Sequence, residues 1–292
     1  MADELFEVLK KHKEKAIILF LALCVLDVSL YIQISGREKN RDLSLHFLGV
    51  GQGDSELVML PGGVKVLIDG GPINGKALSE LSKILPGTDR YIDLVVMSHP
   101  QTDHFGGLID VLKDYSIGAF LWSGREGTAT SFMNLKEVMA EKGIRDIRVG
   151  KGDRIDYENN VIQVLAPWKS LMNSKELNDT TVVLELESKN TKTLFTGDIG
   201  SKIEDQLVAD GLGVIDILKV AHHGSKYSSP AEFLKTLHPK LSVIEVGKNS
   251  YGHPTKEALQ RIGAIGSSLY RTDEYGTVSV VIDGKAMRVY RP

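Results

Sequence analysis

Aspartate or histidine follows an apolar, strand-like run at five separate places in the chain. The five are Asp69 after VLI, His99 after VVMS, Asp198 after TLFTG, the pair His222 and His223 after LKVA, and His253 six residues after VIEVG. In α/β folds, ligand sites form outside the carboxyl ends of neighbouring strands. A fold that suits this pattern must bring distant strand ends to one edge, and we expect these side chains to meet in one pocket.

The order of the segments from Leu43 onward indicates the fold class. Two β-rich blocks, one starting at Leu43 and one in the middle of the chain, each lead into alternating strand and helix patterns. Such an order favours two sheets that pack face to face with helices on the outside. We therefore predict an α/β fold, a four-layer αββα sandwich.

The N-terminal part of the chain differs from the rest. The apolar run 16–34, AIILFLALCVLDVSLYIQI, is about as long as a helix needs to cross a bilayer. Asp27 within it costs roughly 2–3 kcal/mol near the centre of a membrane, but the Leu, Ile and Val residues keep insertion favourable. The flank before the run, KKHKEK, is basic, which favours a cytoplasmic N-terminus and an extracytoplasmic remainder.

Three other interpretations of this run have less support. No small-x-small cleavage site follows it, as a cleaved signal peptide requires. Leu23 precedes Cys24, where a lipoprotein signal needs a small residue, and no polar face interrupts residues 16–25, as a buried amphipathic helix requires. We predict a cytoplasmic basic tail at 1–15, a transmembrane helix at 16–34, a linker at 35–42 and one domain at 43–292.

Composition excludes some classes of site. The single cysteine, Cys24, rules out intrachain disulfides and any cysteine-rich zinc site. The formal net charge is −3, which weighs against tight non-specific nucleic-acid binding through a broad basic face. A local basic cluster or a bound cation remains compatible with this charge.

The segment SHPQTDHFGGL predicts a metal site. It follows the apolar run DLVVM directly and places His99, Asp103 and His104 within six residues. Imidazole and carboxylate groups suit Zn²⁺, Mn²⁺ or iron. An aspartate can bridge two cations, and paired metals about 3.5–4 Å apart activate water and stabilise an in-line displacement. We therefore expect one or two divalent ions, Zn²⁺ or Mn²⁺.

Seven separated motifs together resemble the metallo-β-lactamase superfamily. They are FLGVGQGDSELVMLPGGVKVLIDGG, SHPQTDHFGGL, NDTTVVLEL, LFTGDIG, LKVAHHGSKYSS, VGKNSYGHP and YRTDEYGTVSV, and they cover nearly all of residues 43–292. Within the superfamily the order is similar to the C-terminal domain of the ComEC competence proteins and its stand-alone relatives. The resemblance implies the αββα fold, a dinuclear metal site and nuclease activity on single-stranded DNA.

The resemblance also implies roles for individual residues. Asp69 matches an aspartate that orients ligands, and Asp198 matches the bridging aspartate. Metal positions of the His-x-His-x-Asp-His motif are matched by His99, Asp103 and His104. A late histidine completes the second site, and the candidates are His222, His223 and His253. We favour His222 as the ligand, with His223 or His253 as proton donor or phosphate contact.

The chain departs from the superfamily pattern at two positions. Gln101 stands where the motif has its second histidine, and a neutral amide is a poor Zn²⁺ ligand. The histidine expected before Asp198 is also missing, and Asn178 lies in that stretch. The first metal site should therefore be weaker or hold a harder cation such as Mn²⁺, and a single-metal or inactive site stays open.

Further residues are candidates for contacts near the site. The segment GVGQGDS lacks the Lys-Ser/Thr ending of a phosphate loop, so we interpret it as a tight turn that places Asp54 near the site. Ser225 could contact phosphate. Arg271 could steady substrate or form a structural ion pair with Asp273.

The residues together predict a membrane-anchored, metal-dependent hydrolase with an extracytoplasmic catalytic domain. We expect metal-activated water to attack a phosphodiester, with single-stranded DNA among the candidate substrates. Asp103 would hold metal and orient the nucleophile, and a late histidine would protonate the leaving group. The alternatives are a phosphorylcholine or wall-polymer esterase, a lactonase, or a catalytically weakened surface-binding module, since fold alone does not decide.

Overall fold

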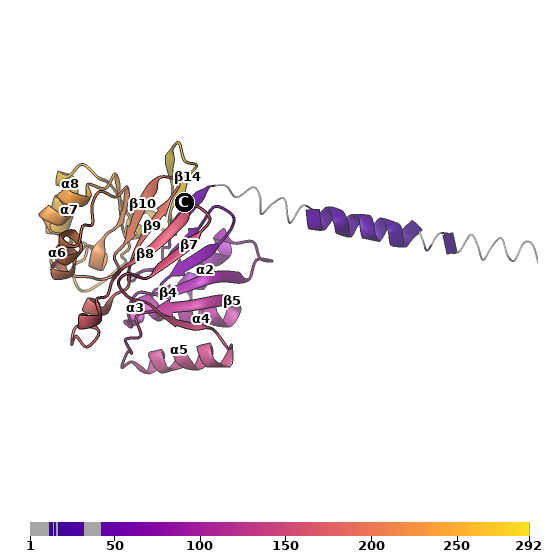
Figure 1. Ribbon diagram of the computed structural model, residues 1–292, viewed down its shortest axis with the longest axis horizontal. Helices are drawn as coiled ribbons and strands as arrows, with labels where there is room; N and C mark the ends of the chain where they lie inside the picture. The colour runs from indigo at the N-terminus through magenta and orange to yellow at the C-terminus, as the bar shows by residue number, and fades with distance from the viewer. Residues whose placement is uncertain (1–11, 14, 16, 32–41, 292) are drawn as a thin grey trace, which may run out of the picture. The chain divides into compact units, whose positions relative to one another are not determined.

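Figure 1 shows the computed structural model, which describes residues 12, 13, 15, 17–31 and 42–291. The chain divides into two compact units, one of which comprises residues 42–60 and 64–291. The other contains a helix at residues 17–31, whose apolar side chains, such as Phe20 and Val25, are exposed.

The predicted membrane span is not established by this helix. Among the residues that the structure describes, no helix is both long enough and apolar enough to cross a bilayer. The predicted span 16–34 extends over residues 16 and 32–34, which lie outside the described part of the chain, as do most of the predicted tail (1–15) and linker (35–42). These assignments therefore stay predictions.

The first sheet has eight strands in the order β15-β14-β1-β2-β3-β4-β5-β6. Strands β1, β2 and β3 pair antiparallel, whereas β3 to β6 pair parallel. The chain's last strands return to this sheet, because β14 pairs with β1. The bounds are β1 Leu43–Phe47, β2 Glu56–Met59, β3 Lys65–Ile68, β4 Tyr91–Met97, β5 Ser116–Trp122, β6 Asp146–Arg148, β14 Val278–Ile282 and β15 Met287–Tyr290.

The second sheet has seven strands in the order β13-β12-β11-β10-β9-β8-β7. Here β7 to β10 are antiparallel and β10 to β13 are parallel. Both sheets thus change from antiparallel to parallel pairing. The bounds are β7 Arg154–Tyr157, β8 Asn160–Ala166, β9 Val183–Ser188, β10 Thr191–Phe195, β11 Ile217–Lys219, β12 Leu241–Ile244 and β13 Ser268–Arg271.

Helices cover the outer face of each sheet, as Figure 1 shows. The first sheet is covered by α2, α4 and α5, and the second by α6, α7 and α8. Apolar residues four apart, such as Ala77 and Leu81 in α2, turn one buried face toward the strands. The bounds are α2 Lys76–Ile84, α3 Thr102–Phe105, α4 Leu108–Asp114, α5 Thr130–Glu141, α6 Ser201–Ala209, α7 Ala231–Leu237, α8 Lys256–Ala264 and α9 Thr272–Tyr275.

Three hydrophobic clusters correspond to the three interfaces of a four-layer sandwich. The cluster between the sheets includes Leu45 of β1 and Leu184 of β9. One outer cluster joins the first sheet to α2, α4 and α5, and the other joins the second sheet to α6, α7 and α8. The predicted two-sheet αββα sandwich is confirmed. One detail was not predicted: of the three short strands in the middle of the chain, β6 belongs to the first sheet and β7 and β8 to the second.

We expect Leu184→Ala to lower the free energy of unfolding by about 2–5 kcal/mol, because Leu184 is buried between the sheets and its truncation leaves a cavity. Val214→Ala, at an exposed position, is the control and should change stability little. Urea denaturation of the full chain measures both. Equal stability of the two variants would contradict the assignment of Leu184 to the inter-sheet core.

Candidate metal centre

The strand ends of both sheets deliver their polar residues to one buried cluster. Asp69 and His99 follow β3 and β4 of the first sheet, while Asp198 and His223 follow β10 and β11 of the second. His104 joins them from the short helix α3, and each of these five residues is at most 1% exposed. The cluster therefore lies at the meeting edge of two sheets, not at the edge of one.

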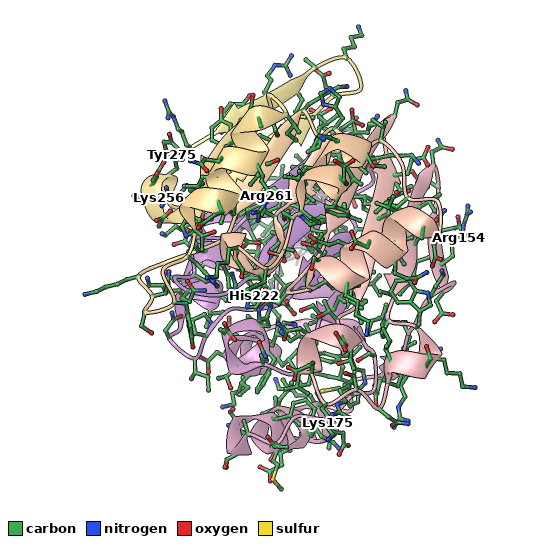
Figure 2. All side chains as sticks on the ribbon, turned by 90° about the vertical axis from the view of Figure 1, so that its left-hand side faces the viewer. Arg154, Lys175, His222, Lys256, Arg261 and Tyr275 are labelled. Carbon is green, nitrogen blue, oxygen red and sulfur yellow. The ribbon has the colours of Figure 1, made fainter. Side chains whose placement is uncertain are left out.

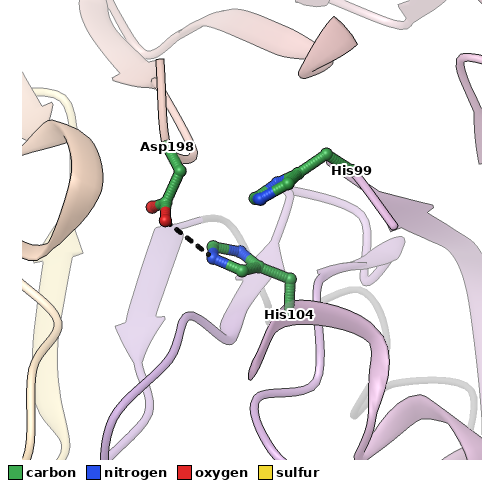
Figure 3. Close-up of side chains that lie close together, drawn as sticks. All are labelled: His99, His104 and Asp198. Carbon is green, nitrogen blue, oxygen red and sulfur yellow. Dashed lines mark ion pairs between the residues drawn. The ribbon is translucent and has the colours of Figure 1, made fainter. Parts of the chain in front are cut away.

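Four donor atoms approach one another in pairs within this cluster. His104 Nε2 lies 3.3 Å from Asp198 Oδ2, and His223 Nε2 lies 3.4 Å from the same oxygen. His223 Nε2 is also 3.6 Å from Asp103 Oδ2. Figure 3 shows His99 and His104 pointing toward Asp198, with the His104–Asp198 pair marked.

These donors fit a divalent cation. Ligands about 2.0–2.1 Å from a tetrahedral zinc are separated from one another by about 3.3 Å, close to the separations seen here. Within the described part of the chain, His104 Nε2 and His223 Nε2 are buried and have no hydrogen-bond partner. Buried polar atoms without partners are costly, so their convergence is a reason to expect an ion.

The other ring nitrogen of each histidine is held in place. His104 Nδ1 lies 2.8 Å from Asp69 Oδ2, and that carboxylate also accepts hydrogen bonds from the backbone and hydroxyl of Ser98. His223 Nδ1 lies 2.8 Å from the Glu245 carbonyl oxygen and 3.2 Å from Asp54 Oδ1. Acceptors on Nδ1 orient the rings of metal-binding histidines and leave Nε2 facing the cation.

Backbone conformation separates the two adjacent histidines. His222 and His223 have φ angles of 51° and 53°, so both adopt the left-handed conformation that is uncommon outside glycine. The side chain of His223 is buried, whereas that of His222 is 34% exposed, with its Nε2 3.8 Å from Asp198 Oδ2. In Figure 2 His222 lies on the face turned to the viewer. The structure thus places His223 among the converging donors and His222 at their outer side, although our prediction favoured His222 as ligand.

His99 lies beside the four donors in a different environment. Its ring centroid is 4.1 Å from that of His104, and its Nε2 is 3.0 Å from Gln101 Oε1. Burial lowers the pKa of His99 to about 4, which keeps this ring neutral. His99, His104 and Asp198 form a second candidate group, in which the Gln101 amide competes for the His99 nitrogen.

Lys219 provides a buried positive charge behind the donors. Its side chain is fully buried, its Nζ forms an ion pair with Asp54 and donates a 3.1 Å hydrogen bond to the Gly197 carbonyl oxygen, and it lies 4.0 Å from Asp198 Oδ1. Burial alone would lower the pKa of Lys219, but the Asp54 and Asp198 carboxylates raise it above its usual value. Lys219 therefore stays charged and offsets part of the carboxylate charge.

The electrostatic field of the pocket favours positive charge. Burial would lower the pKa of His223, but Asp198 and Asp54 raise it to about 10. The pKa of His104 is likewise raised against burial, mainly by Asp198 and Asp54. Carboxylates that hold protons on two buried imidazoles would also attract a divalent cation, which competes with those protons.

A pair of carboxyl groups, Glu56 and Glu245, adjoins Lys219 and Asp54 from opposite sheets. Burial and the neighbouring carboxylates raise the pKa of Glu56 to about 8 and that of Glu245 well above its usual value. Glu245 Oε1 accepts a 3.0 Å hydrogen bond from the backbone N–H of Ser55, which links the two sheets.

The turn at GVGQGDS touches the loop that carries Asp103. Gly53 has φ +139°, and a Cβ at this position would collide with the Asp103 carbonyl oxygen. Only glycine permits this approach, which brings Asp54 beneath His104 and His223. The turn thus positions Asp54, as the sequence predicted, and no helix follows it.

Other predicted residues lie outside the cluster. Asn178 is in a 3₁₀ turn at Leu177–Thr180, and Arg271 pairs with Asp273 and Glu274. Ser225 is buried in the loop after His223, where its hydroxyl accepts from the Tyr227 N–H. His253 is half-buried beside His222, with their ring centroids 5.5 Å apart, and we call the partly exposed side of the cluster at these two residues the opening.

Sequence reasoning missed three buried charged residues: Lys219, Glu56 and Glu245. Each is a single charge within an apolar strand-like run, in ILKVA, SELVML and SVIEVG. A charge in such a position is almost never fully buried unless it is paired. This signal could have indicated that they face one another across the two sheets.

Comparison with known proteins identifies the class. Residues 48–247 match the metallo-β-lactamase superfamily, so the chain belongs to this superfamily. Two sheets with a cluster of histidine and aspartate at their shared edge agree with that assignment. The chain is a metal-dependent hydrolase of this superfamily, and its fold binds divalent metals.

Within the superfamily the chain is similar to ComEC-like competence proteins, as its motifs predicted. It is 28% identical to ComE operon protein 3 of Bacillus subtilis (strain 168) over 191 residues, 65% of this chain and 24% of that protein. It is 27% identical to competence protein ComA of Neisseria gonorrhoeae over 249 residues, 82% of this chain and 33% of that protein. The chain spans about a quarter to a third of these relatives.

A solved structure shows the same fold. Zn²⁺-bound PqqB from Methylobacterium extorquens aligns with a TM-score of 0.56 at 11% identity, over 80% of this chain and 99% of that one.

We expect His223→Asn to weaken divalent-cation affinity at least about tenfold, because it removes one of the converging donors. His222→Asn is the matched control at the adjacent, half-exposed position and should leave affinity close to that of the parent. Competition with a chromogenic chelator measures both. The opposite order of the two effects would identify His222 as the ligand.

We expect Lys219→Met to lower the free energy of unfolding of the chelator-treated chain by about 3–5 kcal/mol, because it leaves buried carboxylates without their cation. Combining it with Asp54→Asn should recover part of this loss. Lys192→Met, which removes a half-exposed ion pair with Glu185, should cost less than about 1 kcal/mol. A Lys219→Met variant as stable as the parent in urea would contradict the ion-pair account.

Proposed function

We propose that this chain is a metal-dependent phosphodiesterase. The observation that carries the proposal is the approach of His104 Nε2 and His223 Nε2 to Asp198 Oδ2, at separations that suit ligands of one cation, with Asp103 Oδ2 3.6 Å from His223 Nε2. These four residues would hold the first ion, and His99 with Asp198 would contribute to a weaker second site. When bound, the cation supplies Lewis-acid activation of water and of a phosphoryl oxygen.

The protein's own groups have separable roles in this proposal. Asp69 and Asp54 hold the Nδ1 sides of His104 and His223, which fixes the ring orientations. The Asp103 side chain is 35% exposed, so it borders both the donors and the opening, where it can orient the attacking water. His253, at the opening, is placed to give a proton to the leaving group.

A phosphodiester suits the charge at the opening. The segments 221–230 and 246–256, which follow β11 and β12, contain three exposed lysines, Lys226, Lys248 and Lys256. Their other ionisable side chains are histidines and tyrosines, and neither segment contains Asp or Glu. An anionic substrate would therefore meet cations on entry.

We further propose that residues 16–34 anchor the chain in a membrane with the catalytic domain outside the cytoplasm. The described helix at 17–31 exposes apolar side chains, including Leu19, Phe20 and Val25, which a lipid environment would cover. The basic residues before it favour a cytoplasmic N-terminus.

We expect chelator treatment of the full chain to abolish hydrolysis of bis(p-nitrophenyl) phosphate and Mn²⁺ or Zn²⁺ to restore it, because the donors alone cannot activate water. Asp198→Asn should lower kcat/KM at least about 100-fold, since this carboxylate faces both histidines. Arg154→Ala, at an exposed position of strand β7, is the control and should have the same kcat/KM as the parent.

Parallel rates on single-stranded DNA, a choline phosphodiester and an acyl lactone decide between the enzyme classes. Hydrolysis that survives complete metal removal would refute a metal-dependent mechanism. A metal-loaded chain that cleaves only the lactone would refute phosphodiester chemistry.

A further inference from the structure

The segment that carries His223 contains three non-glycine residues in the left-handed conformation. His222, His223 and Ser229 have φ angles of 51°, 53° and 53°. Such residues adopt this conformation at a cost in free energy, so neighbouring groups must hold the backbone there. Those groups help to keep the His223 imidazole directed at Asp198.

A buried carboxyl group of helix α6 holds the far end of this segment. Glu204 is 0% exposed, and its two side-chain oxygens accept hydrogen bonds of 2.9 and 2.7 Å from the backbone N–H of Ser229. The other buried residues of α6, Ile203 and Leu207, are apolar, so Glu204 is the polar member of a packed helix face. A carboxyl group is almost never fully buried unless it is paired, and the partner here is a residue in the left-handed conformation.

A second helix holds the same residue from its other side. Arg261 of α8 donates a 2.8 Å hydrogen bond from Nε to the Ser229 carbonyl oxygen, and its Nη2 donates to the carbonyl oxygens of Lys226 and Ser228. Figure 2 shows Arg261 on the same face as His222. Ser229 is therefore fixed at its N–H by α6 and at its C=O by α8.

Helix α6 also joins the segments that carry two of the donors. It begins three residues after Asp198, at Ser201, whose N–H donates a 3.0 Å hydrogen bond to the carbonyl oxygen of Tyr227 in the segment after His223. The contact made by Glu204 is a second link between the same two segments. A single helix thus sets the position of one donor segment relative to the other.

We propose that Glu204 is a positioning residue for the candidate metal centre, because it holds the left-handed backbone of the His223 segment through Ser229. It acts on the direction of the His223 imidazole and not by touching the cation. Groups outside the ligand set that orient metal-binding side chains commonly tune metal affinity. The inference rests on the proposed metal-dependent function and adds to it a residue outside the donor cluster.

The protonation of Glu204 determines its conservative replacement. Burial raises the pKa of this carboxyl group to about 8, with a smaller contribution from Asp205, whereas the Ser229 hydrogen bonds and the Arg261 charge oppose the rise. The group is therefore mostly neutral at pH 7. Glutamine presents the same neutral carbonyl oxygen to Ser229, whereas methionine has a similar volume and removes this acceptor.

The first test measures Zn²⁺ affinity of the full chain by competition with a chromogenic chelator. Glu204→Met should weaken Zn²⁺ binding at least about fivefold, and Glu204→Gln should stay within about twofold of the parent. Urea denaturation should show that Glu204→Met remains folded, since an apolar side chain of similar volume is tolerated at a buried charged position. Leu207→Ala, on the buried face of the same helix, is the control that loses packing, keeps the Ser229 contact and should keep the parent's affinity.

A second variant separates positioning from the general stability of α6. Ser229→Gly in the Glu204→Met background should recover Zn²⁺ affinity at least about twofold, because glycine adopts positive φ without the strain that Glu204 offsets. A role of Glu204 in helix stability alone would leave the double variant as weak as Glu204→Met.

Amide hydrogen exchange of the chelator-treated chain gives a readout that needs no metal. Residues 221–230 should exchange faster in Glu204→Met than in the parent or Leu207→Ala, because the Ser229 N–H loses its acceptor. Parent-like Zn²⁺ affinity in Glu204→Met, or a Glu204→Gln variant as weak as Glu204→Met, would overturn the positioning role. A parent chain that binds no Zn²⁺, together with faster exchange in Glu204→Met, would leave the hold on Ser229 intact and refute the proposed function.

Discussion

The Asp198 carboxylate facing the His104 and His223 rings is the interaction on which the rest of this structure depends. Asp198 and His223 follow strands of the second sheet, and His104 follows a strand of the first sheet. Their contact therefore joins the two sheets at one edge of the sandwich. Buried charges are tolerated only when they are paired. Lys219 supplies part of that balance, and a divalent cation would supply the remainder.

The packing between the two sheets also positions the donors of the candidate metal site. The apolar cluster between the sheets brings the strand ends together, and the strand ends then hold the donors at the separations a cation needs. The left-handed backbone at His222 and His223 is strain that the surrounding loop must hold in place. It directs the His223 imidazole inward and leaves that of His222 partly exposed.

Much of the fold could be predicted from the sequence. The spacing of apolar residues distinguishes strands from helices, and two β-rich blocks that each lead into strand and helix patterns predict two sheets. The sequence also identified Asp69, His99, His104 and Asp198 as neighbours, since each follows or lies near a strand end. The sequence led us to favour His222 over His223, because it does not show which of two adjacent side chains the loop turns inward. Nor did it reveal the role of Lys219, which depends on an ion pair with Asp54 from a distant turn, or the contact of the Gln101 amide with the His99 nitrogen.

X-ray absorption spectroscopy of the metal-loaded full chain tests the central claim most directly. The account predicts a divalent ion with two imidazole nitrogens and carboxylate oxygens in the parent, and one imidazole fewer in His223→Asn. A parent spectrum without imidazole ligands, or an imidazole number unchanged by that substitution, would show that the donors do not share a cation.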